Sequence, residues 1–243
     1  MNNGTYQPQR SIAFTILHSV KREIFAAAFK DRIVHHVIIG RLNPFFEKEF
    51  ILDSYACRKG KGTSFGIKRI ERFIRKCSKN FTQPCYILKL DVQGFFMHID
   101  RSILHRRLHA FIEKVYDKPD KEKILTLCKT LLEHNPAKNC LIKGSSKDWD
   151  DLPRDKSLFF SKQGCSLPIG NLTSQIFANF YMNSFDHFMK STLRLKYYGR
   201  YVDDFIIIHE DKHYLKKLIV TIREFLINTL NLTLHPKKIF LQH

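Results

Sequence analysis

The strongest constraint on the fold is a pair of adjacent carboxylates, Asp203 and Asp204, between two short strand-like stretches. Residues 195–200 are basic and aromatic, and residues 205–208 read Phe-Ile-Ile-Ile, a composition typical of β-strands. So short a connection predicts a β-hairpin with both carboxylates at its tip. Aspartate is common in turns for local reasons, because its side chain hydrogen-bonds nearby backbone. A functional interpretation therefore requires a second feature.

That second feature is Asp91, at the end of another strand-like run, residues 85–92. If Asp91 and Asp203 project from neighbouring strands, they form a site of hard oxygen ligands suited to Mg²⁺. The remaining coordination positions would be left for water and substrate phosphates. In a basic protein, this pattern indicates phosphoryl transfer.

Apolar periodicity predicts four helices. They span residues 65–79, 100–116, 120–134 and 212–230. Asp100 and Asp120 are expected to cap the second and third, and Asn171 to cap a further helix. In the first helix, Ile67 is expected on the apolar side, away from a cationic stripe. The polar stretch 143–157 predicts a surface excursion. Strands separated by helices without a regular βαβ period predict an α+β fold.

The charge balance points to a polyanionic partner. The chain has 41 Lys and Arg against 23 Asp and Glu, a formal net charge of +18. Such an excess favours nucleic acid, with anionic lipid as the weaker alternative. No stretch approaches the roughly 18 consecutive apolar residues of a membrane span, so a cytoplasmic protein is predicted. The six cysteines form no C-x-x-C pair, so neither a disulfide nor a zinc site is expected.

Three ordered motifs resemble those of reverse transcriptases. Residues 91–96 (DVQGFF) resemble motif A of that family. Residues 167–175 (LPIGNLTSQ) resemble motif B, and residues 201–204 (YVDD) resemble motif C. Outside them, residues 21–24 followed by 29–36 resemble the fingers segment of this family, and residues 232–239 resemble its motif D. Residues 54–63 resemble the diversity-generating retroelement branch of the family. Most reverse transcriptases carry glutamine where this chain has Ile169. The isoleucine and the Asn-Leu-Thr-Ser-Gln string that follows Gly170 are similar to the diversity-generating retroelement branch.

The resemblance implies a right-hand polymerase architecture. Fingers would occupy mainly residues 1–84 and palm mainly residues 85–243, with a fingers-type excursion around 120–165. The palm would be an antiparallel sheet backed by helices. The family continues into a helical thumb, which we expect to be absent from this chain.

The resemblance also implies the metal site. Asp91 and Asp203 would bridge two Mg²⁺ ions, for which Mn²⁺ is a possible substitute, about 3.5 to 4 Å apart. Asp204 would support them, and the carbonyl of Val92 would be a further ligand. Lys238, with its neighbour Lys237 as the alternative, would be the acid that protonates the leaving pyrophosphate.

Nucleotide and nucleic-acid contacts follow from the same resemblance. Arg22, ahead of Lys21, would bind the β and γ phosphates through its planar fork. Phe96 would exclude a ribose 2′-hydroxyl, while Phe95, its neighbour on an extended strand, would point into the core. Gly170 would let the backbone approach the templating pair. Nucleic-acid backbone contacts are expected from Arg58 and from the helical stripe Lys68, Arg72, Arg75, Lys76 and Lys79.

These features predict an RNA-directed DNA polymerase that uses template RNA, a primer and dNTPs. Because Ile169 lacks the hydrogen-bonding group of glutamine, we expect it to be error-prone, as part of a bacterial or phage-encoded diversity-generating retroelement. A small basic accessory protein is the expected partner. The alternatives are another bacterial reverse transcriptase, of the retron, group II intron or phage-defence type, or a non-catalytic RNA-binding fragment.

Overall fold

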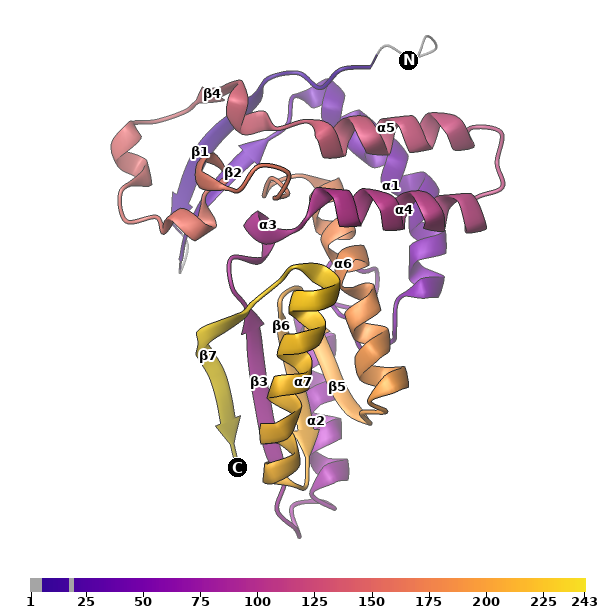
Figure 1. Cartoon of the computed structure of the whole chain (residues 1–243), viewed down its shortest axis with the longest axis vertical. Coiled ribbons are helices and arrows are strands. Elements are labelled where there is room, and N and C mark those ends of the chain that lie inside the picture. Colours follow the sequence, from indigo (N-terminus) through magenta and orange to yellow (C-terminus); the bar gives the residue numbers. More distant parts are fainter. Residues whose placement is uncertain (1–5, 18–19) are drawn as a thin grey trace. The chain divides into compact units, whose positions relative to one another are not determined.

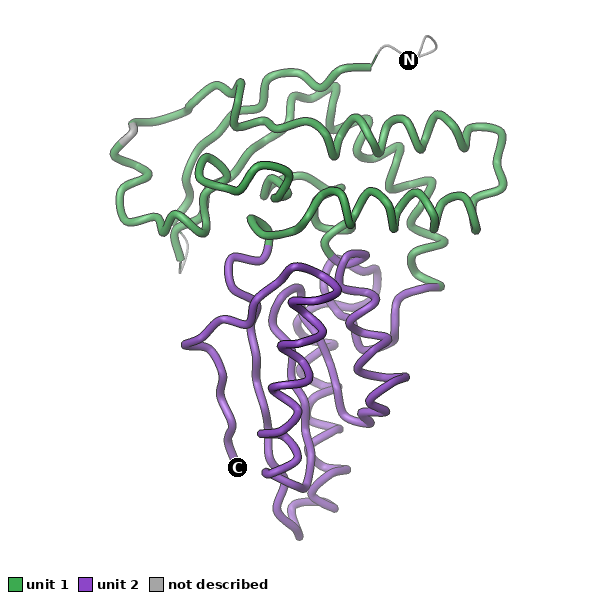
Figure 2. The backbone as a smooth tube through the Cα atoms, viewed as in Figure 1, with its two compact units in different colours: residues 1–48, 96–178 green, residues 49–95, 179–243 purple. Residues whose placement is uncertain are grey.

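The computed structural model describes residues 6–17 and 20–243. The chain divides into two compact units (Figure 2). Unit 1 comprises residues 1–48 and 96–178, and unit 2 comprises residues 49–95 and 179–243. We describe each unit by itself. The assignment of residues 1–84 to fingers and 85–243 to palm stays a prediction.

Unit 1 combines a small sheet with helices (Figure 1). Its strands are β1 (Ser11–Leu17), β2 (Lys21–Ala26) and β4 (Cys140–Ile142), in the order β2-β1-β4, with β1 antiparallel to β2 and parallel to β4. Its main helices are α1 (Phe29–Glu49), α3 (Phe95–His98), α4 (Arg101–Val115) and α5 (Lys121–Glu133), where α1 and α3 each extend one residue into unit 2. Short 3₁₀ turns form at Pro136–Lys138, Ser146–Trp149, Arg154–Lys156 and Leu158–Phe160.

The predicted helix caps of unit 1 have different outcomes. Asp100 caps α4 as expected, because its Oδ1 accepts the N–H groups of Ser102 and Ile103. Asp120 precedes α5, but the prediction that its side chain caps the helix is wrong. Its carboxylate instead accepts the Tyr116 hydroxyl at 2.8 Å and pairs with Arg41 at 3.2 Å. These two side chains, one nearby and one distant in the sequence, therefore each take one of the oxygens that a cap would need.

Unit 2 is built on a four-stranded antiparallel sheet in the order β5-β6-β3-β7. Its strands are β3 (Tyr86–Val92), β5 (Tyr197–Tyr201), β6 (Asp204–His209) and β7 (Leu234–Gln242). Its helices are α2 (Thr63–Cys77), α7 (Lys212–Leu230), the π-helical turn Phe188–Thr192, and the second half of α6 (Leu172–His187), which begins in unit 1. The α+β prediction, with an antiparallel sheet backed by helices, is confirmed.

Alternation along β6 assigns the helices to opposite faces of this sheet. Ile206 and Ile208 belong to a cluster with Phe73 of α2. Phe205 faces the other way and contacts Phe185 of α6, with ring centroids 5.0 Å apart. Both faces of the sheet therefore carry a helix.

The apolar side of α2 is shorter than the periodicity predicts. Ile70, Phe73, Ile74 and Cys77 pack on the sheet, but Ile67 is 62% exposed. The expectation for Ile67 is wrong because the buried cluster begins one turn after it.

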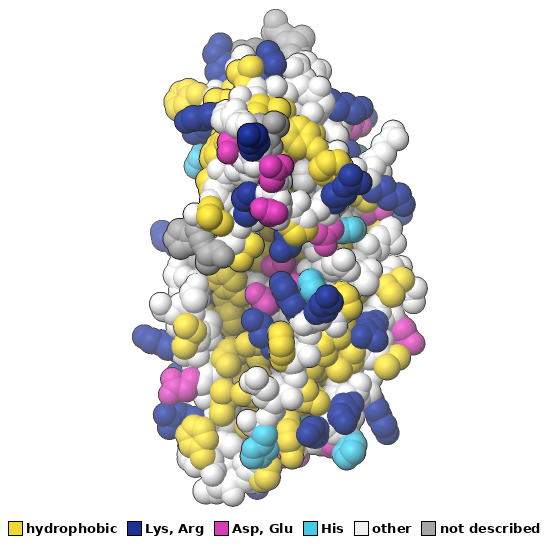
Figure 3. Space-filling view, turned by 90° about the vertical axis from the view of Figure 1, so that its left-hand side faces the viewer, with side chains coloured by type: hydrophobic (Ala, Val, Ile, Leu, Met, Phe, Trp, Pro, Cys, Tyr) yellow, Lys and Arg dark blue, Asp and Glu magenta, His cyan; other side chains and the backbone are white. Residues whose placement is uncertain are grey.

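The edge strand β7 is also partly open, and Figure 3 shows hydrophobic side chains with Lys and Arg around them on the face that looks toward that edge.

No helix in the described part of the chain combines the length and hydropathy needed to cross a membrane.

Candidate active site

The carboxylate pair lies at the tip of a hairpin, as predicted. Tyr201 of β5 is paired with Asp204 of β6, so the turn consists of Val202 and Asp203 alone. Val202 has φ of +57°, in the left-handed region that such tight hairpin turns use at their first position. This conformation is costly for a β-branched residue, so other contacts must hold it.

Asp91 meets this tip across the sheet. It is paired with Asp204 in the antiparallel register of β3 and β6. Directly paired residues have Cβ atoms about 5 Å apart on the same face. Asp91 is buried, with 5% of its surface exposed. The sheet therefore brings the two strands of the predicted site together, although Asp91 and Asp204 are more than a hundred residues apart in the chain.

The carboxylates influence one another electrostatically. Burial first, and then the negative charges of Asp91 and Asp204, raise the pKa of Asp203 to about 6, although the positive charge of Lys238 opposes this shift. Like charges held this close disfavour the ionised form of each group. A bound cation would remove that penalty, because carboxylate oxygens are hard ligands for divalent ions.

A bulge in β7 delivers Lys238 to the site. Ile239 is paired with Leu90 and Leu234 with Val92, so four residues of β7 lie opposite Asp91 alone. This irregularity lets the Lys238 Nζ donate to Asp91 Oδ2 at 2.8 Å. The contact raises the pKa of Lys238 above its ordinary value. Lys238 therefore contacts the site, whereas the alternative candidate, Lys237, is exposed.

The donor set fits a divalent ion that retains water and substrate ligands. In the described part of the chain, no group of three or more His, Cys, Asp or Glu side chains is arranged to hold a metal by itself. Mg²⁺ is commonly held by one or two carboxylates together with substrate phosphates and water. Asp91 and Asp203 meet that requirement. Asp204 is more open, since its carboxylate is 44% exposed and lies 3.4 Å from the Lys89 Nζ.

In unit 1, the two predicted phosphate ligands, Arg22 and Lys21, lie on opposite faces of strand β2. Arg22 is exposed, whereas Lys21 donates to the Asp150 carbonyl at 2.5 Å. Because side chains alternate along a strand, Arg22 shares its face with Ile24 rather than with Lys21. A Cβ at Gly170 would come within 2.8 Å of the Ile24 side chain. The structure therefore associates Arg22, and not Lys21, with the motif B segment.

The other nucleotide-binding candidates of unit 1 also converge. Phe96 and Ile169 pack against one cluster that includes Phe25 of β2. The Ile169 carbonyl accepts the Phe25 N–H at 2.8 Å. Gly170, at φ +117°, permits a close approach to β2, where the sequence interpretation had placed the templating pair. Asn171 lies directly before α6, and its side-chain oxygen accepts the N–H of Ala27, the residue that follows β2.

The argument that placed Phe95 in the core is wrong, although its conclusion holds. Phe95 is 2% exposed. Strand alternation does not apply, however, because residues Phe95–His98 form the short helix α3. The role of Phe96 as a steric gate stays a prediction.

Of the predicted nucleic-acid contacts, Arg58 has a local use. Its guanidinium donates to the carbonyls of Ile51 and Ser54 at 2.6 and 2.9 Å. The predicted cationic stripe is exposed: Lys68, Arg72, Arg75 and Lys76 lie on α2, and Lys79 lies in the turn after its end, because the helix stops at Cys77 rather than at residue 79. Arg75 also pairs with Glu71 at 2.9 Å. Their contacts with nucleic acid stay a prediction.

Sequence reasoning missed Glu23, which is 1% exposed. Its carboxylate accepts the Trp149 indole at 2.7 Å, the Ser157 hydroxyl at 2.8 Å and the Leu158 N–H at 2.6 Å. These bonds join β2, and thus the strand of Arg22, to the polar excursion. The alternation of β2, with a charged residue among buried positions, was the one sequence pattern that could have revealed it.

Comparison with known proteins agrees with this geometry. A family model described as reverse transcriptase (RNA-dependent DNA polymerase) matches residues 19–243. A nuclear intron maturase from Arabidopsis thaliana mitochondria is 29% identical over 85 residues, which are 35% of this chain and 11% of the maturase.

Telomerase structures resemble the fold. The telomerase of Candida albicans, solved with a fragment of telomeric RNA, has a TM-score of 0.66 and 13% identity over 99% of this chain and 44% of its own. A truncated apo telomerase of Candida tropicalis has a TM-score of 0.61 and 16% identity over 96% of this chain and 50% of its own. This chain therefore spans half or less of these relatives. Because the family model covers nearly the whole chain, the protein belongs to the reverse transcriptase (RNA-dependent DNA polymerase) family.

Proposed function

We propose that the protein is an RNA-directed DNA polymerase that extends a primer on template RNA with dNTPs. The observation that carries the proposal is the meeting of Asp91 with the Val202–Asp203 turn on a reverse transcriptase fold, with Lys238 bonded to Asp91. A module that only binds RNA gains nothing from acidic residues beside the phosphates, because they repel the polyanion.

Each residue of this site has a defined task. Asp91 and Asp203 hold the divalent ions, and the Val92 carbonyl and Asp204 assist. Two ions bound there, Mg²⁺ or Mn²⁺, would supply the positive charge that an in-line displacement needs at both the attacking and the leaving oxygens. Lys238 is positioned to give a proton to the departing pyrophosphate, since a lysine ammonium is protonated at neutral pH and its bond to Asp91 holds it at the site.

Nucleotide selection is assigned to unit 1. Arg22, which is exposed on β2, binds the β and γ phosphates bidentately. Phe96 and Ile169 share one apolar cluster and shape the pocket for the sugar and base. We further propose that the exposed cations of α2 contact the nucleic-acid backbone.

The test is dNTP incorporation on an RNA template with an annealed DNA primer and Mg²⁺. The wild-type chain is compared with Asp203→Ala and with Asp117→Ala, which removes an exposed carboxylate elsewhere. We expect incorporation by the wild type and by Asp117→Ala, and none by Asp203→Ala. Salt-sensitive RNA binding without incorporation by any variant would favour a non-catalytic RNA-binding protein.

Within the family, we propose an error-prone enzyme of the diversity-generating type, from a bacterium or phage and acting with a small basic accessory protein. Ile169 supports this, because it can offer only shape and dispersion where a glutamine would hydrogen-bond. Ile169→Gln is expected to lower misincorporation opposite template adenine, whereas the exposed Ile67→Gln is not. An unchanged error spectrum in Ile169→Gln would refute the assignment of fidelity to this residue.

A second candidate is an intron-type reverse transcriptase. The match to a mitochondrial intron maturase favours it. Such an enzyme would bind a structured intron RNA in preference to other RNAs. Competition between intron RNA and an unrelated RNA of equal length would distinguish the two candidates.

A further inference from the structure

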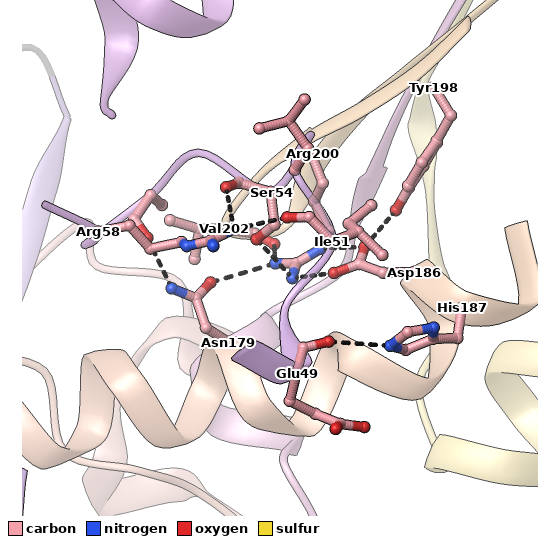
Figure 4. Close-up of polar contacts among 12 residues, drawn as sticks. Glu49, Ile51, Ser54, Arg58, Asn179, Asp186, His187, Tyr198, Arg200 and Val202 are labelled. Carbon is pink, nitrogen blue, oxygen red and sulfur yellow. Dashed lines mark hydrogen bonds and ion pairs between the residues drawn. The ribbon is translucent and has the colours of Figure 1, made fainter. Parts of the chain in front are cut away.

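A buried guanidinium stands directly behind the carboxylate turn. Arg200 of β5 is 1% exposed, and each of its five N–H donors has an acceptor (Figure 4). Asp186 takes two of these bonds, at 2.7 and 2.6 Å. Ser54 Oγ takes one at 3.2 Å, Asn179 Oδ1 one at 3.3 Å, and the Val202 carbonyl one at 2.7 Å.

The backbone of Arg200 is held as firmly as its side chain. Its N–H donates to the Asp53 carbonyl, and its own carbonyl accepts the Tyr55 N–H, both at 2.9 Å. Asp186 in turn accepts the Tyr198 hydroxyl at 2.6 Å. Hydrogen bonds therefore hold both the backbone and the side chain of Arg200 in place within unit 2.

An ion pair in this position is not explained by stability alone. Neither Arg200 nor Asp186 has exposed side-chain surface. Removing both charges from water carries a desolvation cost that often equals or exceeds the attraction between them, so an apolar pair of similar volume would stabilise the protein as well or better. What an apolar pair cannot provide is a hydrogen bond to the Val202 carbonyl.

That carbonyl belongs to the peptide group joining Val202 to Asp203. Val202 adopts φ of +57°, a conformation unfavourable for a β-branched residue. The bond from Arg200 holds this peptide group in place, and with it the backbone from which the Asp203 carboxylate projects. A peptide that relaxed toward negative φ at Val202 would turn Asp203 away from Asp91.

We propose that Arg200, clamped by Asp186, is a positioning residue that holds the Val202–Asp203 turn in the conformation needed for catalysis. The expected effect on kcat rests on the proposed function, whereas the expected effect on the conformation of the turn does not. Arg200 touches neither substrate nor metal and acts only through the turn.

The test compares Arg200→Lys with Tyr198→Phe. Lysine keeps the charge, but one amine cannot reproduce the planar fork that reaches Asp186 and Val202 together. Tyr198→Phe is the matched control, because it removes a bond to the same Asp186 and leaves the bond to Val202. Hydrogen exchange at the Asp203 N–H, on the same peptide group as the Val202 carbonyl, should accelerate in Arg200→Lys and stay unchanged in Tyr198→Phe.

The kinetic readout follows from the displaced carboxylate. We expect kcat to fall about 100-fold in Arg200→Lys, as for other displacements of about 1 Å in catalytic groups. The Mg²⁺ concentration for half-maximal rate should rise, while the KM for dNTP changes little. Tyr198→Phe should lower the melting temperature without either kinetic change.

A second variant keeps the inference falsifiable if Arg200→Lys does not fold. Arg200→Met combined with Asp186→Leu replaces the ion pair by an apolar pair, which commonly preserves the fold. A folded double variant with wild-type kcat and wild-type exchange at Asp203 would overturn the inference. Accelerated exchange at Asp203 in a chain whose wild type incorporates no dNTP would instead refute the proposed function and leave the positioning role supported.

Discussion

The packing of Tyr55 offers the sharpest test of the structure behind the site. Its ring is 3% exposed and lies between two glycines, Gly66 of α2 and Gly199 of β5. A Cβ at Gly66 would lie 2.8 Å from the ring atom Cδ2. A Cβ at Gly199 would lie 2.9 Å from Cε2 and Cζ, and closer still to the hydroxyl oxygen. Alanine at either position must therefore move the ring.

At both glycines, the gain from replacing glycine offsets part of the packing cost. Overpacking a buried site costs about 1 to 3 kcal/mol. In α2, alanine regains about 1 kcal/mol of helix propensity, so Gly66→Ala should cost about 0 to 2 kcal/mol. In β5, alanine regains about 0.5 to 1 kcal/mol of chain entropy, so Gly199→Ala should cost about 0 to 2.5 kcal/mol.

Removal of the hydroxyl separates the two contacts. Tyr55→Phe alone loses a bond of 3.3 Å to Asp53 and should cost about 0.5 kcal/mol. Since the hydroxyl is the atom nearest to a Cβ at Gly199, Tyr55→Phe should recover about 1 kcal/mol of the Gly199→Ala penalty. It should recover nothing from Gly66→Ala, whose Cβ meets ring carbons that both residues share.

The assay is urea denaturation of the single and double variants at constant m-value, analysed as two double-mutant cycles. Favourable coupling for the Gly199 pair and additivity for the Gly66 pair are expected. Equal coupling in both cycles, or additivity within about 0.5 kcal/mol in both, would refute the packing argument. Gly199 directly precedes Arg200, so Gly199→Ala should also slow incorporation, and Tyr55→Phe should partly restore it.

Three further predictions concern single groups. Burial lowers the pKa of His35 to about 4, so the unfolded chain binds the proton more tightly than the folded chain does. The free energy of unfolding should therefore fall as the pH drops from about 6.5 toward 4. His35→Asn should flatten this dependence by up to about 1.4 kcal/mol per pH unit, measured by denaturation at several pH values. Asp211 caps α7 by accepting two N–H groups, so Asp211→Ala should lower the midpoint of urea denaturation, while the exposed Asp117→Ala should leave it unchanged. Glu23→Ala leaves buried donors unpaired and should cost about 2 to 3 kcal/mol, with a shift in the emission of Trp149, the chain's one tryptophan.

Local patterns predicted the elements well where the pattern and the burial agree. The stripe from Leu215 to Leu230 predicted α7 with its observed bounds, because each of those leucines faces the core. The hairpin around Asp203 followed from two strand-like runs and a connection too short for anything else. Local reasoning failed where side chains outside the helix intervened, as when the distant Arg41 and the nearby Tyr116 bound the Asp120 carboxylate.

For the candidate site, too, some features followed from the sequence and others only from the structure. Residue type and order predicted Asp91, Asp203 and Asp204 as site residues, because their chemistry is a property of the side chains and their motifs are contiguous. The preference for Lys238 over its neighbour came from the spacing of motif D, whereas the β7 bulge that directs it to Asp91 could be known only from the structure.

The sequence gives no signal for Arg200, and its one signal for Glu23 is the alternation of β2. Arg200 lies in a basic, aromatic stretch where one more cation is unremarkable, and Glu23 lies in a strand beside two exposed or half-exposed cations. Their partners are distant in the chain: Ser54 lies 146 residues from Arg200, and Leu158 lies 135 residues from Glu23. A local pattern encodes secondary structure and chemistry, but the long-range hydrogen bonds that a buried charge needs exist only once the chain has folded.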